Sequence, residues 1–191
     1  MSRSAGLALA LAAGLIGAIA GYLASAIPWP AGKVTSDTSD AHLWTEVKWP
    51  FPVDQWGTGR AFACKTSDCG AELKLYLRAK LGACNCTTGV ADDDDLDRMS
   101  DFDLVGGEVS PFGVGRPVTI AWMKGRSRAY ALTAHNRPGR SALSVVFNDR
   151  CDMIVATVVL PHDQPATIEP TVMEFLNSRT VLHWAELALG I

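Results

Sequence analysis

Five cysteines are the residues of this chain whose type and spacing point most directly to chemistry. In an exported protein, cysteines pair by default as disulfides. Cys64 and Cys69 flank a predicted turn, where opposed strand positions lie close enough for a bridge. Cys84 and Cys86 are separated by one residue, so we expect each to pair elsewhere, which permits crosswise bridging to Cys64 and Cys69. Cys151 opens an apolar segment, and we expect it to be a buried free thiol because five is odd.

The first four cysteines allow two other kinds of site. Four thiolates are the ligand number of a structural zinc site, and copper(I) also takes soft sulfur ligands. The spacings of 4, 14 and 1 intervening residues match no zinc-finger or zinc-ribbon pattern. A strained bridge is also easily reduced and exchanges thiols. We adopt structural disulfides without a cofactor and keep, as the alternative, a zinc, copper or thiol-redox site at Cys64, Cys69, Cys84 and Cys86.

An acidic run carries seven of the 20 acidic side chains within residues 92–103. Calcium prefers several carboxylates in one loop, which makes Asp93, Asp95 and Asp97 candidate ligands. An EF-hand pattern starting at Asp93 fails, because its sixth position is Arg98 and its twelfth is Leu104. The interpretation we adopt is a short amphipathic helix whose first-turn aspartates favour the helix dipole.

No catalytic motif accompanies these residues, so we assign no catalytic residue and favour a protein that is not an enzyme. The chain has no G-x-S-x-G elbow, and its glycine pairs lack the pattern of a phosphate loop. Lys124, Arg126 and Arg128 surround a predicted hairpin turn, which is typical of a solvated turn, with lipid headgroups or an acidic partner as the alternative. The net charge of -3 argues against nucleic acid as a partner.

The N-terminal segment determines where these residues are placed in the cell. Residues 5–27 carry no charge over 23 positions, which is long enough for a transmembrane helix, and Arg3 precedes them. We therefore expect a single-pass protein of a bacterial inner membrane with its C-terminal domain in the periplasm. The alternative is signal cleavage after residues 24–26, which leaves a soluble periplasmic protein. Gly17, Gly21 and Ser25 share one helix face and suit packing in a membrane-protein complex.

The remaining chain predicts an α+β domain over residues 57–191, after a Pro- and Trp-rich linker and lead-in over 28–56. Residues 72–81 alternate polar and apolar side chains, which is typical of a half-buried strand. Hairpins complete a mainly antiparallel sheet of about six strands, with a turn at Lys124 and Gly125 in one of them. The predicted strands cover residues 59–64, 72–81, 118–123, 127–132, 142–147 and 151–160. A C-terminal helix, capped by Thr167 with Pro170 in its first turn, is expected on one face of the sheet.

Taken together, these patterns predict an exported or membrane-anchored envelope protein. Its disulfide-stiffened domain is expected to be a non-enzymatic accessory or interaction module. The alternative is a thiolate protein that binds zinc or copper or exchanges thiols.

Overall fold

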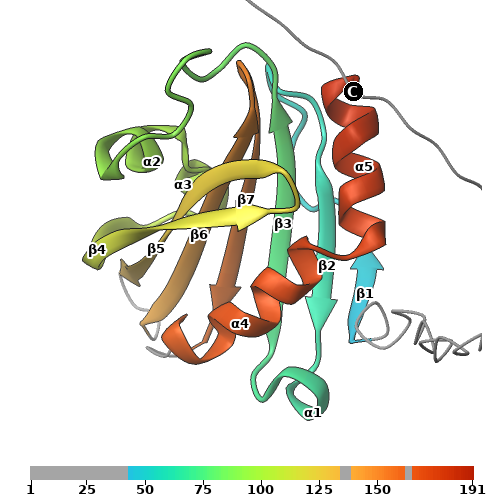
Figure 1. The fold of residues 1–191 in the computed structure, drawn as a ribbon. Helices are drawn as coiled ribbons and strands as arrows, with labels where there is room; N and C mark the ends of the chain where they lie inside the picture. The colour runs from blue at the N-terminus through green and yellow to red at the C-terminus, as the bar shows by residue number, and fades with distance from the viewer. Residues whose placement is uncertain (1–42, 134–138, 162–164) are drawn as a thin grey trace, which may run out of the picture. The chain divides into compact units, whose positions relative to one another are not determined.

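The computed structural model describes residues 43–133, 139–161 and 165–191. They form one seven-stranded antiparallel sheet with the strand order β1-β2-β3-β7-β6-β5-β4 (Figure 1). In chain order the strands are β1 (Trp44–Val47), β2 (Arg60–Cys64), β3 (Leu73–Lys80), β4 (Glu108–Ile120), β5 (Met123–Thr133), β6 (Arg140–Asp149) and β7 (Asp152–Leu160). The predicted α+β architecture with a mainly antiparallel sheet is confirmed, and β1 is a strand beyond the predicted six.

Two C-terminal helices cover one face of this sheet (Figure 1). Helix α4 (Pro165–Leu176) packs over β5 and β6, and α5 (Arg179–Leu189) packs over β3 and β7. The apolar positions of β3 alternate, so its leucines at 73, 75 and 77 all enter this core fully buried. Phe175 of α4 stacks on Trp44 with ring centroids 4.9 Å apart, which joins β1 to the same core.

The segment between β3 and β4 covers the opposite face. It contains α2 (Asp93–Met99) and α3 (Phe102–Val105), while the four-residue α1 (Thr66–Cys69) lies in the β2–β3 turn. Leu96 of α2 is fully buried in a cluster with Val146 and Val155 of the two central strands. Since β6 and β7 are apolar on both sides, helices on both faces keep these strands out of water.

Three buried charged side chains and the exposed Asp54 form a cluster on this second face. Arg78 of β3 is 2% exposed and pairs with Asp101 through Nε at 2.9 Å and through Nη2. Lys80 Nζ lies 2.7 Å from the same Asp101 carboxylate, and Arg78 also pairs with Asp54. Burial opposes the charged form of Arg78, but Asp101 and Asp54 outweigh it and raise its pKa. The cluster therefore joins the loop before β2 and the α2–α3 segment to β3.

The turn between β4 and β5 lies at Ala121 and Trp122, so the predicted turn at Lys124 and Gly125 is wrong. Gly125 lies within β5, where a Cβ would come 2.0 Å from the carbonyl oxygen of Val146. The glycine is therefore needed for close approach to β6 and does not mark a turn. Ala121 adopts a φ of 50°, which the short hairpin requires.

Helix α4 begins at Pro165, earlier than the sequence predicts, and Pro170 lies inside it. Proline suits a first helical position, so Pro165 takes the role expected of Pro170. The predicted N-terminal membrane segment, with Gly17, Gly21 and Ser25, lies outside the described residues. Within the described ranges, no helix is long and apolar enough to span a membrane.

Candidate binding groove

Alternation along β5 places small side chains toward α4 and large ones toward α2. Ser127 reaches Glu169 of α4, and Ala129 faces the same side. Arg126 and Arg128, at the intervening positions, bind aspartates of α2 on the opposite face. Small residues under α4 leave space between the helix and the sheet.

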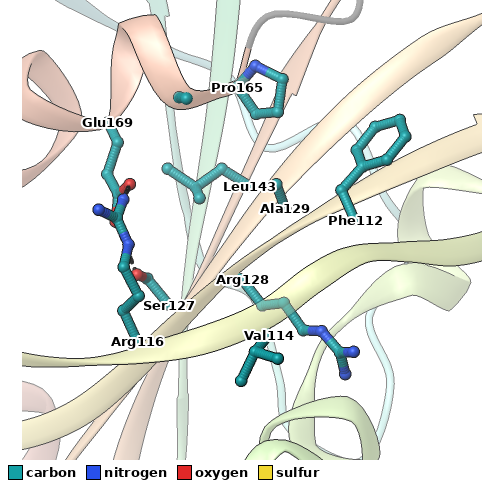
Figure 2. Close-up of a pocket in the computed structure, with 10 residues that line it drawn as sticks. Phe112, Val114, Arg116, Ser127, Arg128, Ala129, Leu143, Pro165 and Glu169 are labelled. Carbon is teal, nitrogen blue, oxygen red and sulfur yellow. Dashed lines mark hydrogen bonds and ion pairs between the residues drawn. The ribbon is translucent and has the colours of Figure 1, made fainter.

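That space is a groove of about 510 Å³ between β4, β5 and the beginning of α4 (Figure 2). Its apolar lining consists of Phe112, Val114, Ala129, Leu143, Pro165 and Ala166. Phe112 and Val114 belong to the edge strand β4 and are exposed, by 44% and 81%. A volume of this size and a largely apolar lining are typical of a small-molecule site, for which the usual range is roughly 300–1,000 Å³.

Three polar residues meet at one side of the groove (Figure 2). Ser127 Oγ donates a hydrogen bond to Glu169 Oε1 at 2.6 Å, and Arg116 of β4 forms an ion pair with Glu169 Oε2. Ser127 and Glu169 are buried, at 2% and 8% exposure, whereas the Arg116 side chain is 66% exposed. Both carboxylate oxygens of Glu169 are thus engaged within the protein, while most of the Arg116 side chain is exposed.

A second hollow of about 430 Å³ adjoins this polar group on its other side. It shares Arg116 and Glu169 with the groove and is further lined by Val118, Pro170 and Met173. The Arg116–Glu169 ion pair therefore lies between two apolar hollows and bridges β4 to α4.

The outer wall of the groove is a bulge in β4 where the register with β5 shifts between Phe112 and Arg116. Arg126 Nη2 donates to the carbonyl oxygen of Gly115 at 3.0 Å, and Arg128 Nε donates to that of Gly113 at 2.9 Å. These two bonds fix the backbone on either side of Val114, whose side chain forms part of the wall.

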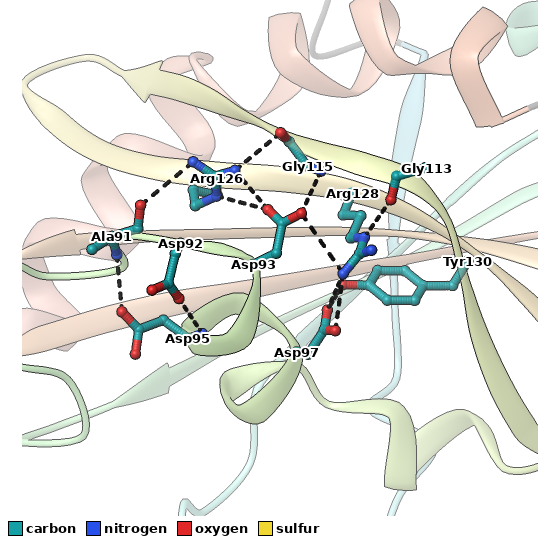
Figure 3. Close-up of polar contacts among 10 residues, drawn as sticks. All are labelled: Ala91, Asp92, Asp93, Asp95, Asp97, Gly113, Gly115, Arg126, Arg128 and Tyr130. Atoms are coloured by element: carbon teal, nitrogen blue, oxygen red, sulfur yellow. Dashed lines mark hydrogen bonds and ion pairs between the residues drawn. The ribbon is translucent and has the colours of Figure 1, made fainter.

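Aspartates of α2 hold the two arginines in turn (Figure 3). Arg126 Nη2 lies 2.6 Å from Asp93 Oδ1, and Arg128 Nη1 lies 3.0 Å from Asp97 Oδ2. Tyr130 donates to the second oxygen of Asp97 at 2.5 Å. Burial, together with Asp97, raises the pKa of Tyr130, which keeps the phenol protonated as a donor.

The aspartates named as calcium ligands therefore bind protein groups. Asp95 accepts from the N–H of Ala91 at 3.1 Å and pairs with Arg98, while Asp93 and Asp97 bind the β5 arginines. In the described part of the chain, no group of three or more His, Cys, Asp or Glu side chains is arranged to hold a metal ion. The predicted amphipathic helix is present as α2, with Asp92 accepting from the N–H of Asp95 as its cap.

The expectation of a solvated basic turn is wrong for two of its three residues. Arg126 and Arg128 lie within β5, and their side chains are 16% and 14% exposed. The sequence could not place them, because their aspartate partners are about 30 residues earlier in the chain.

Two disulfides join four of the five cysteines: Cys64 to Cys69 and Cys86 to Cys151. Cys84 is the buried free cysteine, so the expectation that Cys151 stays free is wrong. The reason is the β6–β7 turn, which brings the backbone of Cys151 within a 3.2 Å hydrogen bond of the Cys84 N–H. Cys84 and Cys86 therefore lie at this turn, and the crosswise bridges expected to Cys64 and Cys69 are not formed.

This pairing separates the four cysteines of the alternative thiolate site. Cys64 and Cys69 are bonded to each other, and Cys86 is bonded to a cysteine outside the set. Burial and the neighbouring Asp152 raise the pKa of the Cys84 thiol, which lowers its thiolate fraction.

A comparison with models of known protein families finds no match, and neither does a comparison with curated protein sequences. The groove residues Arg116, Ser127 and Glu169 were not among the candidates chosen from sequence. One signal for them exists: in residues 125–131 small side chains alternate with large ones, and Glu169 interrupts an apolar helix face.

Proposed function

We propose that this chain is an exported envelope protein whose disulfide-stabilised domain is a non-catalytic binding module, with the groove under α4 as its ligand site. The observation that carries the proposal is the Arg116–Glu169–Ser127 group beside a groove whose remaining lining is apolar except for Arg128. A mostly apolar pocket with a few convergent polar groups is the usual form of a small-molecule site.

The bonding of the polar group favours binding over catalysis. The Ser127 hydroxyl donates a hydrogen bond to one oxygen of Glu169, and the other oxygen pairs with Arg116. These bonds hold β4, β5 and α4 in place around the groove. The exposed guanidinium of Arg116 remains available to contact a ligand.

Export is supported by the two disulfides, since such bonds persist in oxidising compartments. We propose a bacterial inner-membrane protein anchored by residues 5–27, with the domain in the periplasm and no cofactor or nucleic-acid partner. Cleavage of that segment would instead give a soluble periplasmic form. In a membrane-protein complex, Gly17, Gly21 and Ser25 would pack against a helix of the partner. If a Gly17→Leu/Gly21→Leu double variant keeps all its membrane partners, this packing proposal is wrong.

Intact mass of the natively exported chain, measured without reduction after alkylation of free thiols, tests the export and disulfide proposals. A full-length membrane-bound species with one alkylated thiol is the expected result. Several alkylated thiols, or a metal adduct lost on denaturation, would replace the proposal by the thiolate alternative.

Native mass spectrometry of the same membrane-derived material tests the binding module. We expect a small molecule to be retained, and an Ala129→Leu variant, which fills the groove, to lose it. Ala91→Leu, at an exposed position on the opposite face, is the matched control and should keep it. Retention by Ala129→Leu would show that the groove is not the site.

A further inference from the structure

We propose that the groove binds an amphipathic anion, namely a single straight alkyl chain that ends in a carboxylate, with the carboxylate on Arg116 and the chain along the apolar lining. This inference rests on the proposed function, because it names the chemical class of the ligand that the groove would take.

The walls of the groove favour an unbranched apolar chain. Ala129 and Leu143 lie between the polar group on one side and Phe112 and Pro165 on the other (Figure 2). A path over small and aliphatic side chains offers contact along its length without hydrogen-bond partners, which suits methylene groups. Val114, which is 81% exposed, adds a further aliphatic side chain to the lining.

The charges favour an anionic end over a cationic one. Glu169 is 8% exposed, and both its oxygens already accept from Ser127 or Arg116, so a ligand amine finds no open acceptor there. Arg116 uses Nη2 for Glu169, while its side chain is 66% exposed. A guanidinium carries five N–H donors in a planar fork that fits a carboxylate.

Arg128, the other arginine of the lining, does not offer a second anion contact. Its Nε donates to Gly113, and its Nη1 pairs with Asp97 on the far side of the sheet. Figure 2 shows its guanidinium directed away from Arg116. The groove therefore presents one exposed guanidinium at one end, paired through Nη2 with Glu169, and this matches a ligand with one anionic group.

The test is photocrosslinking in membranes that contain the full chain. The probes are a diazirine-bearing long-chain alkanoate, the corresponding alcohol, and a diazirine-bearing phosphatidylglycerol, with labelled peptides mapped by mass spectrometry. We expect the alkanoate to label peptides of β4, β5 and α4. Competition by unlabelled alkanoates should strengthen by about tenfold for every two methylenes added until the groove is filled.

Four variants separate charge recognition from general damage. Arg116→Gln should weaken alkanoate labelling by about tenfold and leave alcohol labelling unchanged. Glu169→Gln removes the carboxylate that competes for Arg116 and should strengthen alkanoate labelling by about threefold. Arg98→Gln is the matched control, since the Arg98 side chain is 63% exposed and, like that of Arg116, is paired with a carboxylate. Val114→Ser replaces an exposed side chain of the lining and should weaken labelling by both the alkanoate and the alcohol without unfolding the domain.

Each other outcome is decisive. If the alcohol and the alkanoate label the groove equally, or if Arg116→Gln leaves alkanoate labelling unchanged, the ligand is not recognised through an anionic group. The proposed binding module would still stand. Groove labelling by the phosphatidylglycerol probe alone overturns the single-chain carboxylate, shows that the ligand is a two-chain membrane lipid, and leaves the proposed binding module standing. If no probe labels the groove while native mass spectrometry finds another retained molecule, the ligand class is wrong and the module stands. If neither method finds a ligand, both proposals fail.

Discussion

Asp93 accepts a hydrogen bond from the backbone N–H of Gly115 at 2.8 Å, so a carboxylate of α2 holds the β4 bulge from the opposite face of the sheet. The same carboxylate binds Arg126, which bonds the carbonyl oxygen of Gly115. A substitution in α2 that removes this carboxylate should therefore alter the β4 bulge that forms the outer wall of the groove.

Replacing Asp93 by Asn should lower the free energy of unfolding by about 1–2 kcal/mol at neutral pH, because the charged bonds to Gly115 and Arg126 weaken. Urea unfolding measures the difference. Asp94→Asn is the matched control, since Asp94 is an exposed neighbour for which the described residues show no hydrogen bond or ion pair. Equal losses in the two variants would contradict the role given to Asp93.

Acid should remove the contribution of Asp93 in the wild type. The N–H of Gly115 and the guanidinium of Arg126 hold the pKa of this carboxyl below its usual range. A lowered folded-state pKa stabilises the fold above the unfolded value of about 3.9, and this stability is lost as the pH falls through the folded value. The difference in unfolding free energy between wild type and Asp93→Asn should therefore shrink below about pH 4. A difference that stays constant would show that Asp93 is not ionised in this bond.

Gly115 should not tolerate a side chain. A Cβ there would lie 2.4 Å from Asp93 Oδ1 and 3.1 Å from the carbonyl oxygen of Ser127. Gly115→Ala must displace the α2 carboxylate, and we expect it to lower the melting temperature by several degrees, equivalent to about 1–3 kcal/mol. Gly139→Ala has open space around its Cβ and should be nearly neutral. A neutral Gly115→Ala variant would show that the bulge adapts freely.

The two disulfides should contribute unequally. The Cys86–Cys151 bond joins residues 65 apart, and the Cys64–Cys69 bond joins residues 5 apart. Loop-closure entropy predicts stabilisation of about 4 and about 2 kcal/mol, respectively. Paired alanine variants, Cys86→Ala/Cys151→Ala and Cys64→Ala/Cys69→Ala, compared by urea unfolding under oxidising conditions, measure both. A larger loss from the short-range pair would contradict the estimate.

The parts of the fold predicted correctly from sequence are those with local signals. Residues 72–81 alternate strictly, so β3 (Leu73–Lys80) could be predicted despite its leucines. β1 (Trp44–Val47) has four residues, pairs with β2 and packs on Phe175 near the other end of the chain, which no local pattern reveals.

The parts of the site that were not predicted depend on long-range contacts. Gly125 resembles a turn residue until β6 is placed beside it. Arg126 resembles a surface cation until Asp93 is brought to it by α2. Cys151 opens an apolar strand and resembles a buried free thiol, because its partner, Cys86, is 65 residues away in the sequence and no local pattern joins the two.

Asp101 should be the most sensitive acidic residue of the domain. It is 2% exposed and pairs with both Arg78 and Lys80. Asp101→Asn keeps the size of the side chain but leaves two buried cations facing a neutral amide, with Asp54 as the remaining carboxylate partner of Arg78. Breaking a buried pair from one side is destabilising by about 3–5 kcal/mol. Urea unfolding should therefore show a loss of that size for Asp101→Asn and almost none for the exposed Asp103→Asn.

A further Arg78→Met substitution should restore part of the loss, because it removes one of the uncompensated cations. If that double variant is less stable than Asp101→Asn alone, Arg78 stabilises the domain through other contacts, and the charge explanation is wrong.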